Sequence, residues 1–113
     1  MTDFHYDIDA DGIATITWDV PDKSMNVLNL EGTAELDALV DKALGDENVV
    51  GVVITSGKAD FAGGMDLNVI SKMAEMAGDD PARGLFDGIM NFHRITRKIE
   101  RAGMDAKNKG GKP

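Results

Sequence analysis

A strongly apolar run followed by a glycine-rich turn constrains this chain more than any other feature. The run covers residues 49–55 (Val-Val-Gly-Val-Val-Ile-Thr), and the turn follows at residues 60–67 (Asp-Phe-Ala-Gly-Gly-Met-Asp-Leu). We interpret this pattern as a buried strand, a tight turn and a helix that begins at Asp66. Such a corner leaves backbone N–H groups free at a helix N-terminus, where the helix dipole favours negative charge. It can therefore hold an anion or the developing oxyanion of a thioester.

The same turn also has a purely structural interpretation. Gly63 and Gly64 permit a positive φ, and Asp66 is a good helix cap. The Gly-x-Gly-x-x-Gly spacing of a dinucleotide-binding turn is absent, and so is the Gly-Lys-Ser/Thr of a phosphate-binding loop. Local chemistry alone does not separate an anion site from an ordinary strand–helix corner.

The first half of the chain predicts a hairpin and a helix. Residues 4–9 and 13–18 alternate apolar and polar side chains, and an Ala-Asp-Gly corner separates them, which predicts a β-hairpin. Asn29 is a good N-cap for a helix over about residues 30–44. Gly45 then suits the left-handed position that ends a helix.

The second half predicts one strand and two helices. The apolar run at 49–55 is typical of a strand covered on both faces, as in parallel or mixed sheets. Helices over residues 67–76 and about 82–102 follow, so that the predicted order is ββαβαα. One face of the last helix is apolar at Leu85, Phe86, Ile89, Phe92, Ile95 and Ile99.

Composition excludes several classes of function. A length of 113 residues allows one domain. The chain has no cysteine, which excludes disulfides, thiolate nucleophiles and zinc–thiolate sites. Neither a signal-peptide pattern nor an apolar run long enough to span a membrane is visible, so we expect a cytoplasmic protein. The net charge of −8 argues against nucleic acid as the main partner.

Charge is unevenly distributed along the chain. From Arg94 onward there are seven basic residues and two acidic ones, so this end is basic while the rest is strongly acidic. One interpretation is a solvated helix face followed by a flexible tail at residues 104–113. The other is a basic rim close to a phosphorylated ligand.

Three segments, in this order, resemble the crotonase (enoyl-CoA hydratase/isomerase) superfamily. They are residues 21–29 (Pro-Asp-Lys-Ser-Met-Asn-Val-Leu-Asn), residues 46–57 after the first helix, and residues 60–67. The resemblance covers residues 4–76. It implies an α/β, crotonase-like ββα spiral fold in truncated form, with residues 1–113 as the N-terminal portion of the domain. Within the superfamily the chain is most similar to multifunctional fatty-acid oxidation proteins, in which a hydratase/isomerase region precedes an NAD-dependent 3-hydroxyacyl-CoA dehydrogenase.

The resemblance also implies roles for individual residues. The backbone N–H of Met65 matches one half of the family's oxyanion hole. Gly63 matches a residue whose carbonyl lies near the CoA adenine. The other implied CoA-binding residues are Lys23, Ser24 and Met25, in the loop along the pantetheine and phosphates, and Gly64, Asp66 and Leu67 around the helix start. CoA would be part of the substrate, with no metal and with NAD only where a dehydrogenase portion is present.

Important parts of the family's machinery have no match in these residues. The second oxyanion N–H and the two hydratase glutamates belong to later segments, and none of the five glutamates here matches them. We therefore expect a nearly inactive fragment of an acyl-CoA-binding enzyme, and a homo-oligomer or complex subunit for the full-length parent. A non-catalytic acyl-CoA-binding or assembly module is one alternative. A small α/β domain with a purely structural turn is another.

Overall fold

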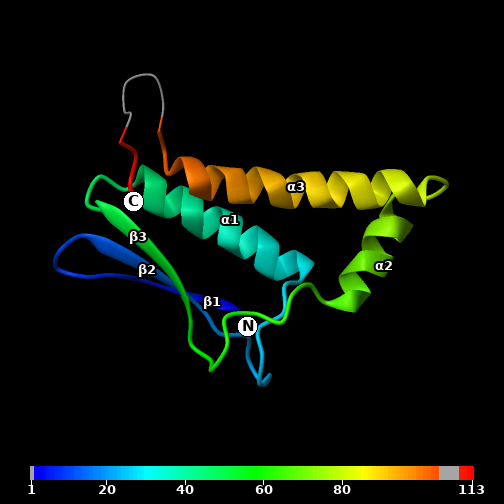
Figure 1. The fold of residues 1–113 in the computed structure, drawn as a ribbon, viewed down its shortest axis with the longest axis horizontal. Helices are drawn as coiled ribbons and strands as arrows, with labels where there is room; N and C mark the ends of the chain where they lie inside the picture. The colour runs from blue at the N-terminus through cyan, green and yellow to red at the C-terminus, as the bar shows by residue number, and fades with distance from the viewer. Residues whose placement is uncertain (1, 105–109) are drawn as a thin grey trace.

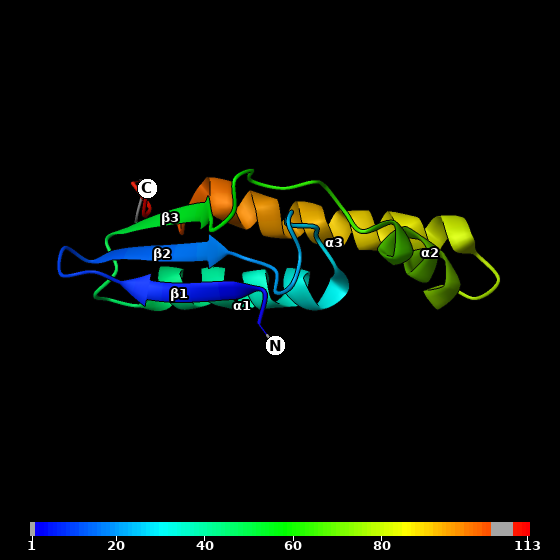
Figure 2. The same ribbon diagram turned by 90° about the horizontal axis from the view of Figure 1, so that it is seen from below.

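The computed structural model describes residues 2–104 and 110–113. Its elements are β1 (Phe4–Ile8), β2 (Ile13–Trp18), α1 (Leu30–Gly45), β3 (Gly51–Ser56), α2 (Leu67–Met76) and α3 (Pro81–Arg101). The predicted order ββαβαα is confirmed. The three strands form one sheet, and α1 and part of α3 lie on one side of it (Figures 1 and 2).

The sheet has the order β1-β2-β3 and mixed strand directions. β1 and β2 pair antiparallel as the predicted hairpin, and their turn is closed by the Gly12 N–H, which donates to the Asp9 carbonyl at 3.1 Å. β2 and β3 pair in parallel, with Ile16 beside Ile54. A parallel pair needs a crossover connection, and α1 supplies it. The chain therefore contains a β2-α1-β3 unit whose third strand leads directly to the glycine turn.

Alternation along the strands separates a core face from an open face. Phe4, Ile16 and Trp18 are buried on the side that carries the helices, where they form the main apolar core. On the opposite side of β3, Val53 is 46% exposed. The prediction that residues 49–55 form a strand covered on both faces is therefore wrong. In the part of the chain that the structure describes, β3 is an edge strand, and it begins only at Gly51 because the Val49 N–H closes a turn onto the Asp46 carbonyl.

α1 begins as predicted but ends differently. The Asn29 side chain accepts a hydrogen bond from the Gly32 N–H at 2.6 Å, which confirms it as the N-cap. Gly45 is the last helical residue, and Asp46 follows in an extended conformation, so the predicted left-handed Gly45 is wrong. The Lys112 ammonium instead donates to the carbonyls of Ala43 (3.0 Å) and Asp46 (2.6 Å). A cation thus satisfies carbonyls at the negative end of the helix dipole.

The apolar face predicted for α3 is only half covered. Ile95 is buried, and Phe92 and Ile99 pack against the core between the sheet and α1. Phe86 is 59% exposed, because α2 and the first half of α3 extend beyond the end of the sheet (Figure 1). Hydrophobic periodicity identified the helix correctly, but it could not show how much of the helix meets a partner.

Ion pairs hold the second half of α3 to α1. Arg94 lies 2.7 Å from Asp37, and Lys98 pairs with Asp37 and, at 2.8 Å, with Asp41. The hydrogen bond from Arg94 and then that from Lys98 lower the pKa of Asp37. Burial lowers the pKa of Lys98, but its hydrogen bonds to Asp37 and Asp41 outweigh this and leave it raised. Arg94 and Lys98 therefore serve contacts within the chain and do not form a free basic rim.

The predicted flexible tail at 104–113 falls partly outside the described residues, which omit 105–109. At the chain end, the Lys112 N–H donates to the Ala102 carbonyl at 2.7 Å. The Pro113 carbonyl accepts from the Val52 N–H at 2.6 Å, on the outer edge of β3. Residues 112 and 113 thus contact the folded part, while the flexibility of the segment as a whole stays a prediction.

The ion pairs of Asp37 with Arg94 and Lys98 should make the free energy of unfolding depend on pH. The Asp37 carboxyl has a folded-state pKa below the ordinary value of 3.8, so the stabilisation is complete above that pH and is lost as the pH falls below it. We expect Asp37→Asn to lower the free energy of unfolding by about 1 kcal/mol at pH 7, and by much less at about pH 2. Urea denaturation at the two pH values measures the difference.

Asp87→Asn is the matched control, because Asp87 pairs with Arg83 within α3 and both side chains are more than half exposed. Its effect should stay within about 0.5 kcal/mol at both pH values. An Asp37→Asn effect of equal size at both pH values would contradict the assignment.

Candidate functional site

The glycine turn is tied to the segment before α1 by backbone hydrogen bonds. Leu28 and Met65 form an isolated parallel bridge. Its two bonds run from the Leu28 N–H to the Gly64 carbonyl and from the Asp66 N–H to the Leu28 carbonyl, both at 2.8 Å. A third bond, 2.6 Å long, runs from the Gly63 N–H to the Asn26 carbonyl. Two segments far apart in the sequence are thereby held in register.

This bridge fixes the direction of the Met65 N–H. Leu28 uses its own N–H and carbonyl to bond the residues on either side of Met65, so the polar groups of Met65 point away from Leu28. Within residues 2–104 and 110–113, neither the Gly64 nor the Met65 N–H has a hydrogen-bond partner. The Met65 side chain packs against the apolar core. The turn therefore presents backbone donors while its side chain serves packing.

Each glycine of the turn has a separate reason to lack a side chain. Gly64 has a φ of +94°, which strains any residue that carries a Cβ. A Cβ on Gly63 would overlap the Met25 sulfur and lie 3.0 Å from the Met25 Cγ. Asp66 then caps α2, accepting from the Asn68 N–H at 2.9 Å. The predicted start of the helix is confirmed.

Asn26 connects four parts of the chain around the turn, and it is completely buried. Its side-chain oxygen accepts from the Val20 N–H at 3.0 Å. Its amide nitrogen lies 2.9 to 3.0 Å from three acceptors, the Trp18 carbonyl, the Ser56 hydroxyl and the Phe61 carbonyl, which share its two hydrogens. The ends of β2 and β3 and the start of the turn therefore converge on one side chain. Sequence reasoning missed it, although a polar residue within Met-Asn-Val-Leu was an available signal.

The predicted CoA loop lies against this turn. Lys23 and Ser24 are exposed, Asp22 has a φ of +61°, and the 42%-exposed Met25 is brought against Gly63. Leu67, at the first position of α2, is 80% exposed. The structure therefore brings Met25, Gly63 and Met65 into one region, with Lys23 and Ser24 on the adjoining loop.

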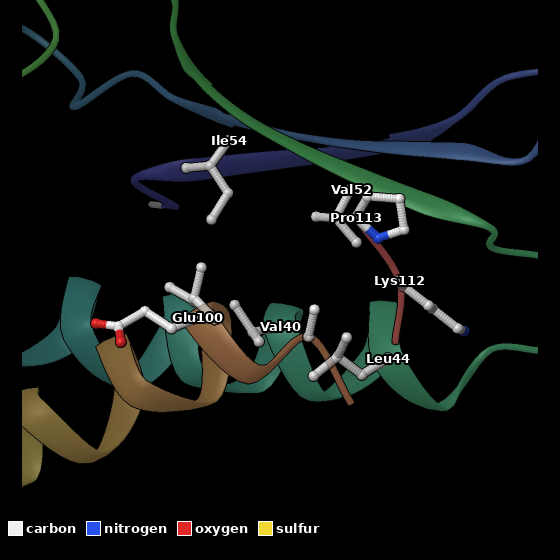
Figure 3. A pocket seen from close by; sticks show the side chains of 9 residues that line it. Val40, Leu44, Val52, Ile54, Glu100, Lys112 and Pro113 are labelled. Atoms are coloured by element: carbon white, nitrogen blue, oxygen red, sulfur yellow. The ribbon is translucent and has the colours of Figure 1, made fainter. Parts of the chain in front are cut away.

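One hollow borders this region, and a second lies apart from it. A polar cleft of about 230 Å³ runs between the first turns of α1 and α2, and its lining includes Glu31, Asp66 and Lys72. A mainly apolar cavity of about 340 Å³ lies between β3, α1 and α3 (Figure 3). Its lining includes Val40, Leu44, Val52, Ile54, Lys112 and Pro113, none of which belongs to the turn.

The described residues hold no cluster of three or more histidines, aspartates or glutamates that could bind a metal ion. In the same part of the chain, no helix combines the length and the apolar character needed to cross a bilayer. Of the glutamates, Glu35 accepts from the Phe4 N–H at 2.6 Å, and Glu31 lines the polar cleft.

Comparison with known proteins decides which family this geometry belongs to. The family model described as enoyl-CoA hydratase/isomerase matches residues 9–97, which include both the CoA loop and the glycine turn. The chain belongs to the enoyl-CoA hydratase/isomerase family. This match confirms the predicted crotonase-like fold and the family resemblance on which that prediction was based.

Curated relatives agree with this assignment. The chain is 41% identical over 68 residues to the fatty acid oxidation complex subunit alpha of Idiomarina loihiensis, covering 59% of this chain and 10% of that protein. It is 39% identical over 61 residues to the same subunit of Shewanella amazonensis, covering 53% and 9%. The chain thus spans about a tenth of the length of these relatives.

Solved structures show the same fold. An enoyl-CoA hydratase/isomerase from Mycobacterium abscessus is similar with a TM-score of 0.70 at 26% identity, over 86% of this chain and 36% of that one. A crotonase from Legionella pneumophila has a TM-score of 0.71 at 20% identity, over 89% and 37%. The family member described here is therefore comparable to about a third of a hydratase/isomerase domain.

Removing the Asn26 side chain should destabilise the chain strongly. Asn26→Ala leaves the buried Val20 N–H and the Phe61 carbonyl without their partner and removes one of two donors from the Trp18 carbonyl, so we expect a loss of about 3 kcal/mol in the free energy of unfolding. Asn91→Ala on the exposed surface of α3 is the control, with an expected change within about 0.5 kcal/mol. Urea denaturation measures both. Equal effects would contradict a central role for Asn26.

Because Gly63 and Met25 are in contact, substitutions at the two positions should have non-additive effects on the free energy of unfolding. Gly63→Ala should cost about 1–2 kcal/mol because the new Cβ displaces the Met25 side chain. Adding Met25→Ala removes the overlap, so the double variant should lose at least about 0.5 kcal/mol less than the sum of the single effects. Gly45→Ala has open space at its Cβ and should raise stability by about 0.4–1 kcal/mol. Additive effects at residues 25 and 63 would contradict the contact.

Proposed function

We propose that this chain is the N-terminal segment of an enoyl-CoA hydratase/isomerase of fatty-acid β-oxidation. In this proposal it binds acyl-CoA thioesters and supplies one backbone N–H of the oxyanion hole, that of Met65. The free Met65 N–H beside the Leu28 bridge is the observation that carries the proposal. Family membership and the names of the relatives support the substrate class.

The turn has the chemistry that a thioester carbonyl requires. Negative charge develops on the carbonyl oxygen as a nucleophile adds or an α-proton leaves, and donors fixed beforehand stabilise it. The Met65 N–H has no competing partner in the described residues, and the Leu28 bridge fixes its direction. Because the donor belongs to the main chain, the methionine side chain is free to pack in the core. The loop at Lys23, Ser24 and Met25 would then lie along the CoA.

The proposal also holds that the catalytic domain is larger than these residues. Apart from the Val52 N–H, which bonds Pro113, the outer edge of β3 and the apolar cavity of about 340 Å³ beneath it are places where a further strand and core side chains would fit. A second N–H and a general acid and base would have to come with them. One missing donor is typically worth about 3–4 kcal/mol, and each missing proton-transfer group a factor of about 10²–10⁴ in rate.

A non-catalytic acyl-CoA-binding or assembly module is the second candidate. It is favoured by the positions of the glutamates, since Glu35 is engaged with the Phe4 N–H and Glu47, Glu75 and Glu100 are exposed on other elements. In this candidate the glycine turn is structural, so an assembly module would not contact a thioester there, whereas an acyl-CoA-binding module would still bind the ligand. The two candidates differ in whether the complete protein turns over its substrate.

Titration with crotonyl-CoA, followed by backbone amide NMR, tests the proposed site. We expect weak binding, with a dissociation constant above about 100 μM, and the largest shifts at the Gly64 and Met65 amides. An S-alkyl-CoA thioether lacks the carbonyl oxygen and should leave the Met65 amide nearly unshifted. Met65→Leu should bind as the parent chain does, because the donor is retained.

Three outcomes are informative beyond this. Identical shifts with thioester and thioether would overturn the assignment of Met65 as the donor. Sub-micromolar binding would show that the site is already complete and would favour the binding module. Hydration of crotonyl-CoA by the chain alone, followed by loss of its enoyl absorbance, should not exceed the buffer rate.

A further inference from the structure

Lys58 is a mostly buried cation next to the predicted CoA loop. Its side chain is only 12% exposed, which is unusual for lysine. The ammonium lies 2.7 Å from the Asp19 carboxylate and donates to the Lys23 carbonyl at 2.5 Å. Lysine donates up to three hydrogen bonds, so one side chain can hold both the residue before the loop and a residue within it.

Neighbouring residues hold both Lys58 and its ion-pair partner Asp19 in place. The Lys58 N–H donates to the Ser56 hydroxyl at 3.0 Å, and Ser56 itself receives a hydrogen bond from Asn26. On the other side, Asp19 packs so closely on Gly57 that a Cβ there would lie 2.9 Å from its carboxylate. Both ion-pair partners are therefore held by the end of β3.

The loop between these points needs such a restraint. Asp22 has a φ of +61°, a left-handed conformation that costs energy for most non-glycine residues and that aspartate tolerates better than most, so contacts to its neighbours help to hold it. The Lys58 bond falls on the next residue, Lys23. Met25, two residues further on, rests against Gly63 of the turn. Holding the Lys23 carbonyl thus also holds the approach to the turn.

We propose that Lys58 is a positioning residue that fixes the loop at residues 22–25 beside the glycine turn and thereby sets the affinity for the CoA part of the ligand. The proposal rests on the proposed function for its ligand, but not for its effect on the loop. Lys58 acts through the Lys23 carbonyl and Asp19, and it does not need to touch the ligand. A loop that adopts the competent conformation only part of the time binds more weakly by that fraction.

The ligand-free chain provides the first test. In Lys58→Met, ¹⁵N relaxation should show the amides of Ser24 and Met25 becoming as mobile as an exposed loop, while those of β2 and β3 keep their order. Lys42→Met removes the same charge from α1 and should leave the loop unchanged. Lys58→Arg should restore part of the order. A loop that is equally ordered in Lys58→Met and in the parent chain would overturn the proposal.

Binding of crotonyl-CoA separates positioning from direct attraction of phosphate. Asp19→Asn keeps the Lys58 charge but removes its anchor. If Lys58 positions the loop, Asp19→Asn and Lys58→Met should both weaken binding, by about fivefold to tenfold. If Lys58 instead attracts the CoA phosphates, Asp19→Asn should bind as well as the parent chain or better, which would overturn the proposal.

If the proposed function is wrong, the titration with crotonyl-CoA gives a different result from those above. If neither the parent chain nor any variant shifts with the thioester, the ligand assignment fails and the affinity part of this proposal fails with it. The order of the ligand-free loop would then still decide whether Lys58 fixes residues 22–25.

Discussion

The site depends on a single buried amide, that of Asn26. Its hydrogen bonds to Trp18, Val20, Ser56 and Phe61 are the point where β2, β3 and the glycine turn meet. Among the described residues, the Val20 N–H and the Phe61 carbonyl have no other partner, and leaving a buried polar group unpaired costs far more than the net gain of an ordinary hydrogen bond. The backbone of the segment that contains Asn26 also bonds the turn, since the Asn26 carbonyl accepts from the Gly63 N–H and Leu28 bonds Gly64 and Asp66.

Around that junction the molecule divides into a well-packed part and a lightly covered part. The sheet, α1 and the second half of α3 share one core, with Ile16 and Ile95 almost inaccessible. α2 and the first half of α3 extend past the sheet and leave Met76 and Phe86 exposed. Local opening in proteins begins where apolar contacts are few. We therefore expect the α2–α3 end to exchange its amides before the core.

Periodicity and capping chemistry predicted the elements well, because both are local. Asn29 and Asp66 cap helices where the sequence placed them. The helix does end at Gly45, but the left-handed conformation predicted for Gly45 was wrong, and the cation that bonds carbonyls at this helix end, Lys112, comes from far along the chain. β3 failed as a doubly covered strand for a related reason, since what covers a strand is decided by other segments. For the site, sequence reasoning found the turn and the loop but not Asn26 or Lys58, whose side chains bond residues six or more positions away.

The candidate donor beside the Leu28–Met65 bridge is a backbone N–H, so it tolerates most substitutions at its own position. Catalysis by a side chain ends with almost any substitution of that residue, but the N–H at position 65 survives every replacement except proline. Selection on position 65 itself would then act on core packing alone. A functional loss in this turn should instead map to neighbours such as Asn26, Leu28 and Gly64, which aim the donor without contributing it.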